Sequence, residues 1–188
     1  MHPNIAVRNV NKACPHPERY SAEDPQSTET EVADLLWGVI RAMQPDAVLE
    51  TGTHKARTSR RMAQALQQNG FGHLDTLDSD EAHAAHATAV LGNLPGTAHH
   101  VASFNFTPSR RYQVALFDTT DKRKLVKEFE RFHPWIDVGS IVAFHDTGTA
   151  WPTRETLRPL EAAGVLSCID FWAPRGVTLC EVKRGPNV

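Results

Sequence analysis

Hydrophobic residues change their spacing several times along this chain of 188 residues, and the changes predict alternating helices and strands. Between positions 32 and 40 apolar residues recur every three or four residues, which is typical of an amphipathic helix. Pro45 marks the end of that helix. Thr28 and Glu31 have the spacing of a capping box, so we expect Thr28 to cap its first turn.

After residue 45, short apolar runs alternate with segments of helical spacing. Strands are predicted at 47–50, 73–78, 98–103, 112–118 and 139–146, and helices at 57–69, 80–92 and 121–136. Strands that alternate with helices of roughly 10–15 residues predict a parallel sheet with right-handed crossovers. Residues 141–144 are all apolar, as expected of a strand that is covered on both faces.

The end of the chain has a different pattern. After a helix at 153–164, strands at 166–173 and 177–183 are separated by only three residues, which predicts a hairpin and an antiparallel last strand. We therefore predict an α/β fold with a Rossmann-like, doubly wound sheet of seven strands. Residues 1–26, rich in proline, asparagine and charge, are expected to form an irregular arm, and residues 27–188 a single domain.

Composition narrows the class of protein. The chain is 40% hydrophobic and 22% charged with a formal net charge of −2, which gives no reason to expect sequence-independent binding to nucleic acid. No apolar stretch approaches the roughly 20 residues that span a membrane, and the N-terminus lacks the apolar core of a secretory signal. Cys14, Cys168 and Cys180 show no C-x-x-C spacing, so we expect free thiols and a cytoplasmic location. Oligomeric state is left open, and a homo-oligomer is compatible with the sequence.

Candidate chemistry gathers where the predicted parallel strands end. The first, second, fourth and fifth strands end in Glu50, Asp78, Asp118 and the pair His145 and Asp146. In an open doubly wound sheet, ligands bind beyond the carboxyl ends of the strands. A single carboxylate there could be a helix cap, but four of five strands ending in one favour a binding site.

The loop in "LETGTHKARTSRR", residues 49–61, contains one glycine, Gly52. A dinucleotide-binding turn needs several glycines so that the backbone can approach a pyrophosphate, and no Gly-Lys-Ser/Thr of a P-loop follows. Glu50 would also repel a pyrophosphate. A ligand with a cationic part and a ribose suits Glu50 and Asp78 better, because one carboxylate can accept hydrogen bonds from both ribose hydroxyls.

Three segments together resemble a known family. Residues 48–59, 74–87 and 114–148 are similar to the ordered motifs of class I S-adenosylmethionine-dependent methyltransferases, in the small-molecule O-methyltransferase-like branch that includes methyltransferase family 24. The resemblance covers about residues 45–184, including the antiparallel final strand. It implies S-adenosylmethionine as cofactor and methyl transfer to a hydroxyl of a small polar acceptor, sugar-like or a natural product.

The resemblance also implies roles for single residues. Gly52 and Thr53, with Glu50, would line the methionine part of the cofactor, Asp78 would hold the ribose, Ser103 and Phe104 would lie near the adenine, and Asp118 would face the sulfonium. In metal-dependent members, Mg²⁺ is held by the carboxylates after strands four and five, here Asp118 and Asp146. Neighbouring strand ends lie about 4.8 Å apart, so two carboxylates there can share a cation that prefers oxygen ligands. Such a metal would lower the pKa of an acceptor hydroxyl.

The chain departs from the family's pattern at several positions. The family's run "DGDHSYE" is "DTTDKRK" at 118–124, so that Asp121 replaces its histidine, a candidate general base. Lys122 is an alternative base, although a lysine in the first turn of a helix is usually solvated. Ala56 stands where the family has the second glycine of its first motif. Thr147 stands where a third metal ligand is expected after Asp146, and it is a poorer ligand than Asp or Asn. His145 is a candidate general base or metal ligand beside Asp146. The alternative is that it packs under the edge of the sheet and forms only local hydrogen bonds.

These departures keep two other classes of protein open. One is a catalytically degenerate protein that binds S-adenosylmethionine as a scaffold, which the altered 118–124 run favours. The other is a nicotinamide-dependent oxidoreductase, which the single glycine disfavours. Trp151 could form part of an aromatic substrate wall, although packing in the core is the simpler interpretation.

Overall fold

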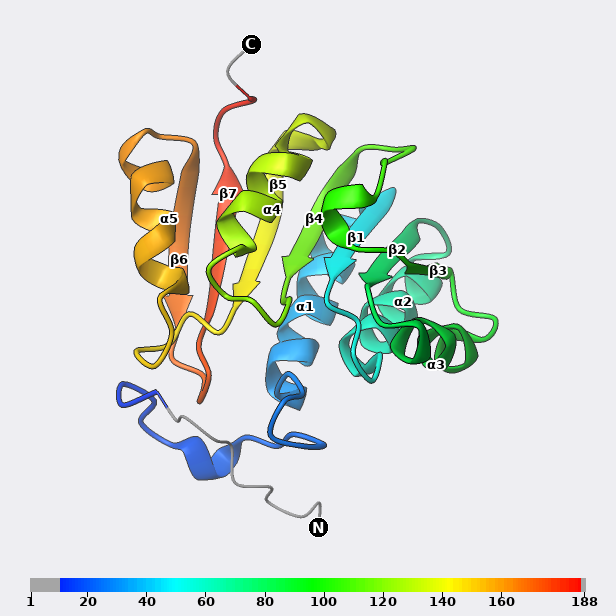
Figure 1. Ribbon diagram of the computed structural model, residues 1–188, viewed down its shortest axis with the longest axis horizontal. Coiled ribbons are helices and arrows are strands. Elements are labelled where there is room, and N and C mark those ends of the chain that lie inside the picture. Colours follow the sequence, from blue (N-terminus) through cyan, green and yellow to red (C-terminus); the bar gives the residue numbers. More distant parts are fainter. Residues whose placement is uncertain (1–10, 187–188) are drawn as a thin grey trace.

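The computed structural model describes residues 11–186 and contains one sheet of seven strands in the order β3-β2-β1-β4-β5-β7-β6 (Figure 1). The strands are β1 Ala47–Thr51, β2 His73–Asp78, β3 Gly96–His100, β4 Tyr112–Phe117, β5 Ile136–His145, β6 Leu166–Phe171 and β7 Val177–Val182. Neighbouring strands from β3 to β5 are parallel, whereas β7 is antiparallel to β5 and to β6. The predicted doubly wound, mostly parallel sheet is confirmed.

Five helices cover the two faces of this sheet. They are α1 Thr30–Met43, α2 Arg57–Asn69, α3 Glu81–Leu91, α4 Leu125–Phe132 and α5 Thr153–Ala162. Side chains alternate along β4, so that Val114 packs with Leu36 of α1 and Met62 of α2, while Phe117 packs with Phe129 of α4 on the other face. Among the described residues, no helix is long and apolar enough to cross a membrane.

The start of α1 differs from the prediction. The helix begins at Thr30, its N-cap Glu29 makes no side-chain cap, and Glu31 accepts hydrogen bonds from the backbone N–H and hydroxyl of Ser21. The hydroxyl of Thr28 donates to the side chain of Asp118, and it accepts no hydrogen bond from an N–H of the first helical turn. The predicted capping box is therefore wrong, because both of its side chains have partners outside the helix.

The helix predicted at 121–136 is also shorter than expected. Asp121 closes a turn, since its carbonyl accepts from the N–H of Lys124 and its carboxylate accepts from the N–H of Arg123. Helix α4 begins only at Leu125, and a 3₁₀ turn at His133–Trp135 follows it. The turn leaves residues 118–124 as a loop at the carboxyl end of β4.

The N-terminal segment lies across the carboxyl ends of the central strands (Figure 1). Within its described part, the N–H of Asn11 donates to Pro174, and Tyr20 packs against Val32, Ala173 and Val177. Residues 1–10 of the predicted arm lie outside the described residues. The arm thus contacts the turn between β6 and β7, far along the chain.

Two of the three cysteines are paired. Cys168 and Cys180 are register partners in the antiparallel β6–β7 ladder and form a disulfide, while Cys14 is free and buried. The expectation of three free thiols is wrong for this pair. The pairing depends on strand register, which places the two side chains on the same face, and not on a local spacing of cysteines.

Candidate active site

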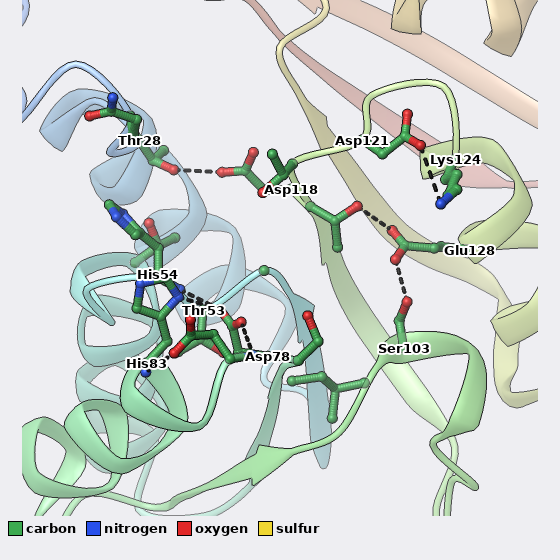
Figure 2. Close-up of a pocket in the computed structure, with 18 of the residues that line it drawn as sticks. Thr28, Thr53, His54, Asp78, His83, Ser103, Asp118, Asp121, Lys124 and Glu128 are labelled. Carbon is green, nitrogen blue, oxygen red and sulfur yellow. Dashed lines mark hydrogen bonds and ion pairs between the residues drawn. The ribbon is translucent and has the colours of Figure 1, made fainter.

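A cavity of about 700 Å³ opens at the carboxyl ends of the strands, beside the point where the strand order changes between β1 and β4. That is where ligands bind in doubly wound sheets. Seven of the predicted site residues line it, and Figure 2 shows most of them: Gly52, Thr53, Asp78, Ser103, Phe104, Asp118 and Asp121. Glu50, His145 and Asp146 do not line it.

The loop after β1 is a tight turn that only glycine fits at its first position. Gly52 has a φ of +88°, and a Cβ there would lie 2.3 Å from the carbonyl oxygen of Asp118. Its N–H donates to Leu77 of β2 at 2.9 Å, which fixes the loop between both neighbouring strands. Ala56 has a φ of +57°, in the left-handed region that favours the glycine of the family pattern. Helix α2 begins directly after it.

Asp78 at the end of β2 points into the cavity with part of its acceptor capacity free. Its two carboxylate oxygens accept from the N–H groups of His54 and Asp80, each at 2.9 Å. A carboxylate offers about four lone-pair positions. The ring Nδ1 of His83 lies 3.4 Å from one of these oxygens. The two backbone bonds therefore fix the side chain, and the lone pairs that they leave can accept from hydroxyl groups.

Glu50 is placed differently from the expectation that it would line the ligand site. It is 1% exposed and lies below the loop, where the hydroxyls of Ser59 and Thr76 donate to its carboxylate. Burial raises its pKa to about 8, against the effect of these two hydrogen bonds. Glu50 supports the loop after β1 from inside the domain and does not meet the cavity.

Glu128 of α4 is a site residue that the sequence analysis missed. Ser103 donates to one of its oxygens, and Thr51 and Thr119 donate to the other at 3.2 and 3.1 Å (Figure 2). Glu128 lines the cavity and joins the end of β1 to the loops after β3 and β4. Its sequence signal is a carboxylate that lies on the buried face of α4, beside Leu125 and Phe129.

His145 is buried and charged, which removes it as a general base. Its Nε2 lies 2.8 Å from Glu29, and its Nδ1 lies 3.1 Å from Asp118. Burial lowers the pKa of His145, but the carboxylates of Asp118, Asp146 and Glu29 outweigh burial and raise the pKa to about 10. An imidazolium without access to the cavity cannot accept a proton from a substrate.

Asp146 binds the side chains of two cations. Arg175, in the turn between β6 and β7, donates from Nε and Nη2 to its two oxygens, each at 2.6 Å. The ammonium of Lys122 lies 2.6 Å from Asp146 and 2.8 Å from Asp118. Lys122 is 8% exposed, so the expectation of a solvated lysine is wrong.

Asp118 is held as a carboxylate by these neighbours. Burial acts to raise its pKa, but the positive charges of His145 and Lys122 keep it well below its usual range. Thr28 donates to the same side chain at 2.8 Å (Figure 2). Asp121 is different: it is exposed, and the hydrogen bond from Lys124 lowers its pKa. Both residues present ionised carboxylates to the cavity.

The predicted magnesium ligands come together, but their surroundings do not suit a metal. Ligand atoms of Asp118, His145 and Asp146 lie within 4.8 Å of one another. The same cluster already contains three carboxylates, counting Glu29, and three cations, His145, Lys122 and Arg175. Because the charges balance and Asp146 is completely buried, the donor set does not fit a divalent cation.

Comparison with known proteins agrees with the fold and the cavity. Residues 49–147, more than half of the chain, match the model of methyltransferase family 24, which is described as a methyltransferase domain. The chain belongs to this family of S-adenosylmethionine-dependent methyltransferases, as its motifs predict. No curated protein matches its sequence.

Solved structures with the same fold share little sequence with this chain. An O-methyltransferase from Bacillus cereus, in complex with SAH, has a TM-score of 0.67 and 16% identity over 84% of this chain and 83% of its own. The O-methyltransferase TomG from Streptomyces achromogenes, in complex with SAM, has a TM-score of 0.66 and 18% identity over 92% and 88%. A methyltransferase from Geobacter sulfurreducens has a TM-score of 0.69 and 15% identity over 82% and 80%. These likenesses support the fold.

Proposed function

We propose that this protein transfers a methyl group from S-adenosylmethionine to a hydroxyl of a small polar acceptor. The observation that carries the proposal is the pair of Gly52 and Asp78 at one end of the cavity. Gly52 permits a close turn at the end of β1, and Asp78 keeps acceptor positions for two hydroxyls of a ribose. The cavity volume of about 700 Å³ lies in the usual range for small-ligand sites.

Different residues of the cavity would contact different parts of the proposed cofactor. Asp78 accepts the ribose hydroxyls, Ser103 and the 42% exposed ring of Phe104 flank the adenine, and the backbone at Gly52 and Thr53 borders the methionine part. When bound, S-adenosylmethionine supplies a methyl group on a positively charged sulfur. The ionised carboxylate of Asp118 provides a complementary charge on the cavity wall.

The acceptor would occupy the part of the cavity near Asp121 and Trp151. The indole N–H of Trp151 is buried and has no hydrogen-bond partner among the residues described, and the residue lines the cavity. A buried N–H without an acceptor is costly, so an oxygen of a polar acceptor fits it. Transfer forms the methyl–oxygen bond, breaks the methyl–sulfur bond and releases the hydroxyl proton, for which Asp121 is the exposed carboxylate on the wall.

Magnesium has no part in this proposal, because Lys122 and Arg175 engage the carboxylates that would bind it. The Cys168–Cys180 disulfide removes the argument from free thiols on which a cytoplasmic location rested. We therefore assign neither a location nor an oligomeric state.

Calorimetry with purified protein tests the cofactor. We expect S-adenosylmethionine to bind the wild type and Asp78→Asn to weaken binding at least tenfold, because the carboxylate loses one acceptor oxygen. Asp137→Asn is the matched control, since Asp137 lies near the start of β5 and pairs with Arg111 outside the cavity. No binding by the wild type, or equal binding by Asp78→Asn, would refute the proposal.

A second measurement separates the enzyme from the alternatives. Methyl-labelled S-adenosylmethionine is incubated with a panel of hydroxylated small molecules, and the products are analysed by mass spectrometry. Labelled methyl ethers support the proposed enzyme, whereas binding without transfer to any of them supports a scaffold. A titration with reduced nicotinamide dinucleotide, followed by fluorescence, should show no binding.

A further inference from the structure

The carboxylates at the ends of β4 and β5 meet side-chain cations where a metal-dependent site would hold a divalent ion. We propose that Lys122 and Arg175 replace that ion, so that the site works without a metal and Lys122 faces the acceptor oxygen. This inference rests on the proposed methyl transfer for the role of the acceptor, but its metal-binding part can be tested separately.

The first argument is the saturation of Asp146. Arg175 takes both of its oxygens in a two-pronged contact, and Lys122 adds a third donor at 2.6 Å. Such forked guanidinium–carboxylate pairs are among the strongest charge-assisted hydrogen bonds. Arg175 is itself fixed, because its Nη1 donates to the carbonyl of Gln26 at 2.7 Å. A metal could reach Asp146 only after these contacts had been broken.

The second argument is the charge balance. Glu29, Asp118 and Asp146 face three cations inside the domain, and His145 and Asp146 have no exposed surface. A divalent ion would add two positive charges to a neutral buried cluster, and an unbalanced buried charge is strongly unfavourable. The protein's own cations thus fill the electrostatic role of the metal.

The third argument is the position of Lys122. Its ammonium has three N–H donors, of which Asp118 and Asp146 take two, and the residue also lines the cavity. The remaining donor can reach an acceptor oxygen. A fixed ammonium beside that oxygen would stabilise the negative charge that develops as the hydroxyl proton leaves. Arg175 keeps Asp146, and through it Lys122, in place.

Binding of Mn²⁺, followed by electron paramagnetic resonance and by thermal unfolding, tests the proposal. The wild type should bind no Mn²⁺ at these carboxylates. Lys122→Ala should bind Mn²⁺ at least tenfold more tightly than the upper limit set by the wild type, because the cluster then lacks the ammonium between Asp118 and Asp146 and is no longer neutral. Adding Asp146→Asn to Lys122→Ala should abolish the gain. Lys127→Ala, on the exposed side of α4, is the control and should resemble the wild type.

Wild-type binding of Mn²⁺ that Asp146→Asn removes would overturn the proposal, and so would a folded Lys122→Ala that gains no affinity. If Lys122→Ala does not fold, Lys122→Gln removes the charge while keeping a polar side chain of nearly the same length and serves in its place, while the wild-type titration decides independently. Failure of S-adenosylmethionine to bind in calorimetry would instead refute the proposed function and leave the result for Mn²⁺ unchanged.

Discussion

Gly52 shows at the scale of one residue how the fold dictates amino-acid identity. Because its φ is +88° and a Cβ would clash with the backbone of Asp118, Gly52→Ala should lower the free energy of unfolding by roughly 2–4 kcal/mol. It should also weaken cofactor binding. The matched control is Gly38→Ala in α1, where a Cβ meets nothing within 4 Å and stability should rise by about 0.5–1 kcal/mol. Urea unfolding of both variants measures the difference, and equal stabilities would contradict the account.

The buried carboxyl group of Glu50 makes the free energy of unfolding depend on pH. Its pKa is about 8 in the folded protein, where burial raises it above the ordinary value of 4.5. Between these two values the unfolded chain releases the proton and the folded protein keeps it, so stability falls as pH rises. Glu50→Gln should therefore gain stability over the wild type from about pH 5 to pH 8, reaching about 3–5 kcal/mol. Exposed Glu155→Gln should show no such trend. A difference between Glu50→Gln and the wild type that stays constant with pH would contradict the assignment.

At the scale of elements, Arg175 joins the turn between β6 and β7 to the N-terminal arm. Its side chain donates to the carbonyls of Gln26 and Ser27 and forms the buried pair with Asp146. Arg175→Met should cost roughly 3–5 kcal/mol, because it leaves Asp146 without its main partner. It should also speed amide hydrogen exchange in residues 21–29. Arg154→Met, which breaks the contacts of Arg154 with Asp170 of β6 and with Glu161 of α5, should leave exchange in the arm unchanged. Slow exchange retained in the arm of Arg175→Met would contradict this link.

The disulfide between β6 and β7 is the basis of a second prediction at the scale of elements. The Cys168–Cys180 disulfide closes a loop with a sequence separation of 12, so its reduction should lower stability by about 3 kcal/mol. Thermal unfolding with and without reductant measures the loss, and thiol titration should detect Cys14 alone in the denatured, unreduced protein. Cys168→Ser should make stability insensitive to reductant. Three titratable thiols before reduction would contradict the pairing.

At the scale of the whole molecule, local patterns predicted the elements well and the site only in part. The bounds of β2 and α2 agree with the prediction because each depends on residues close in sequence. The carboxylates that end β1, β2, β4 and β5 could likewise be found from the strands alone. Which of them face the cavity could not be found, because Glu50 and Asp146 are turned inward by contacts with other elements. Glu29 and Arg175 lie 146 positions apart, and only the folded chain brings them together.

The ion cluster has a consequence for how the chain reaches its native state. Glu29 is the N-cap of α1, near the start of the chain, whereas Arg175 lies in the turn between β6 and β7, near its end. Until the β6–β7 hairpin docks, Asp146 lacks the guanidinium of Arg175 and Glu29 lacks the backbone N–H of Arg175. Closing so long a loop is slow. The wall of the cavity, to which Arg175 belongs, is therefore complete only after the hairpin has docked. A nascent chain that has not yet released its last strands already has its central strands, but it does not yet have its active site.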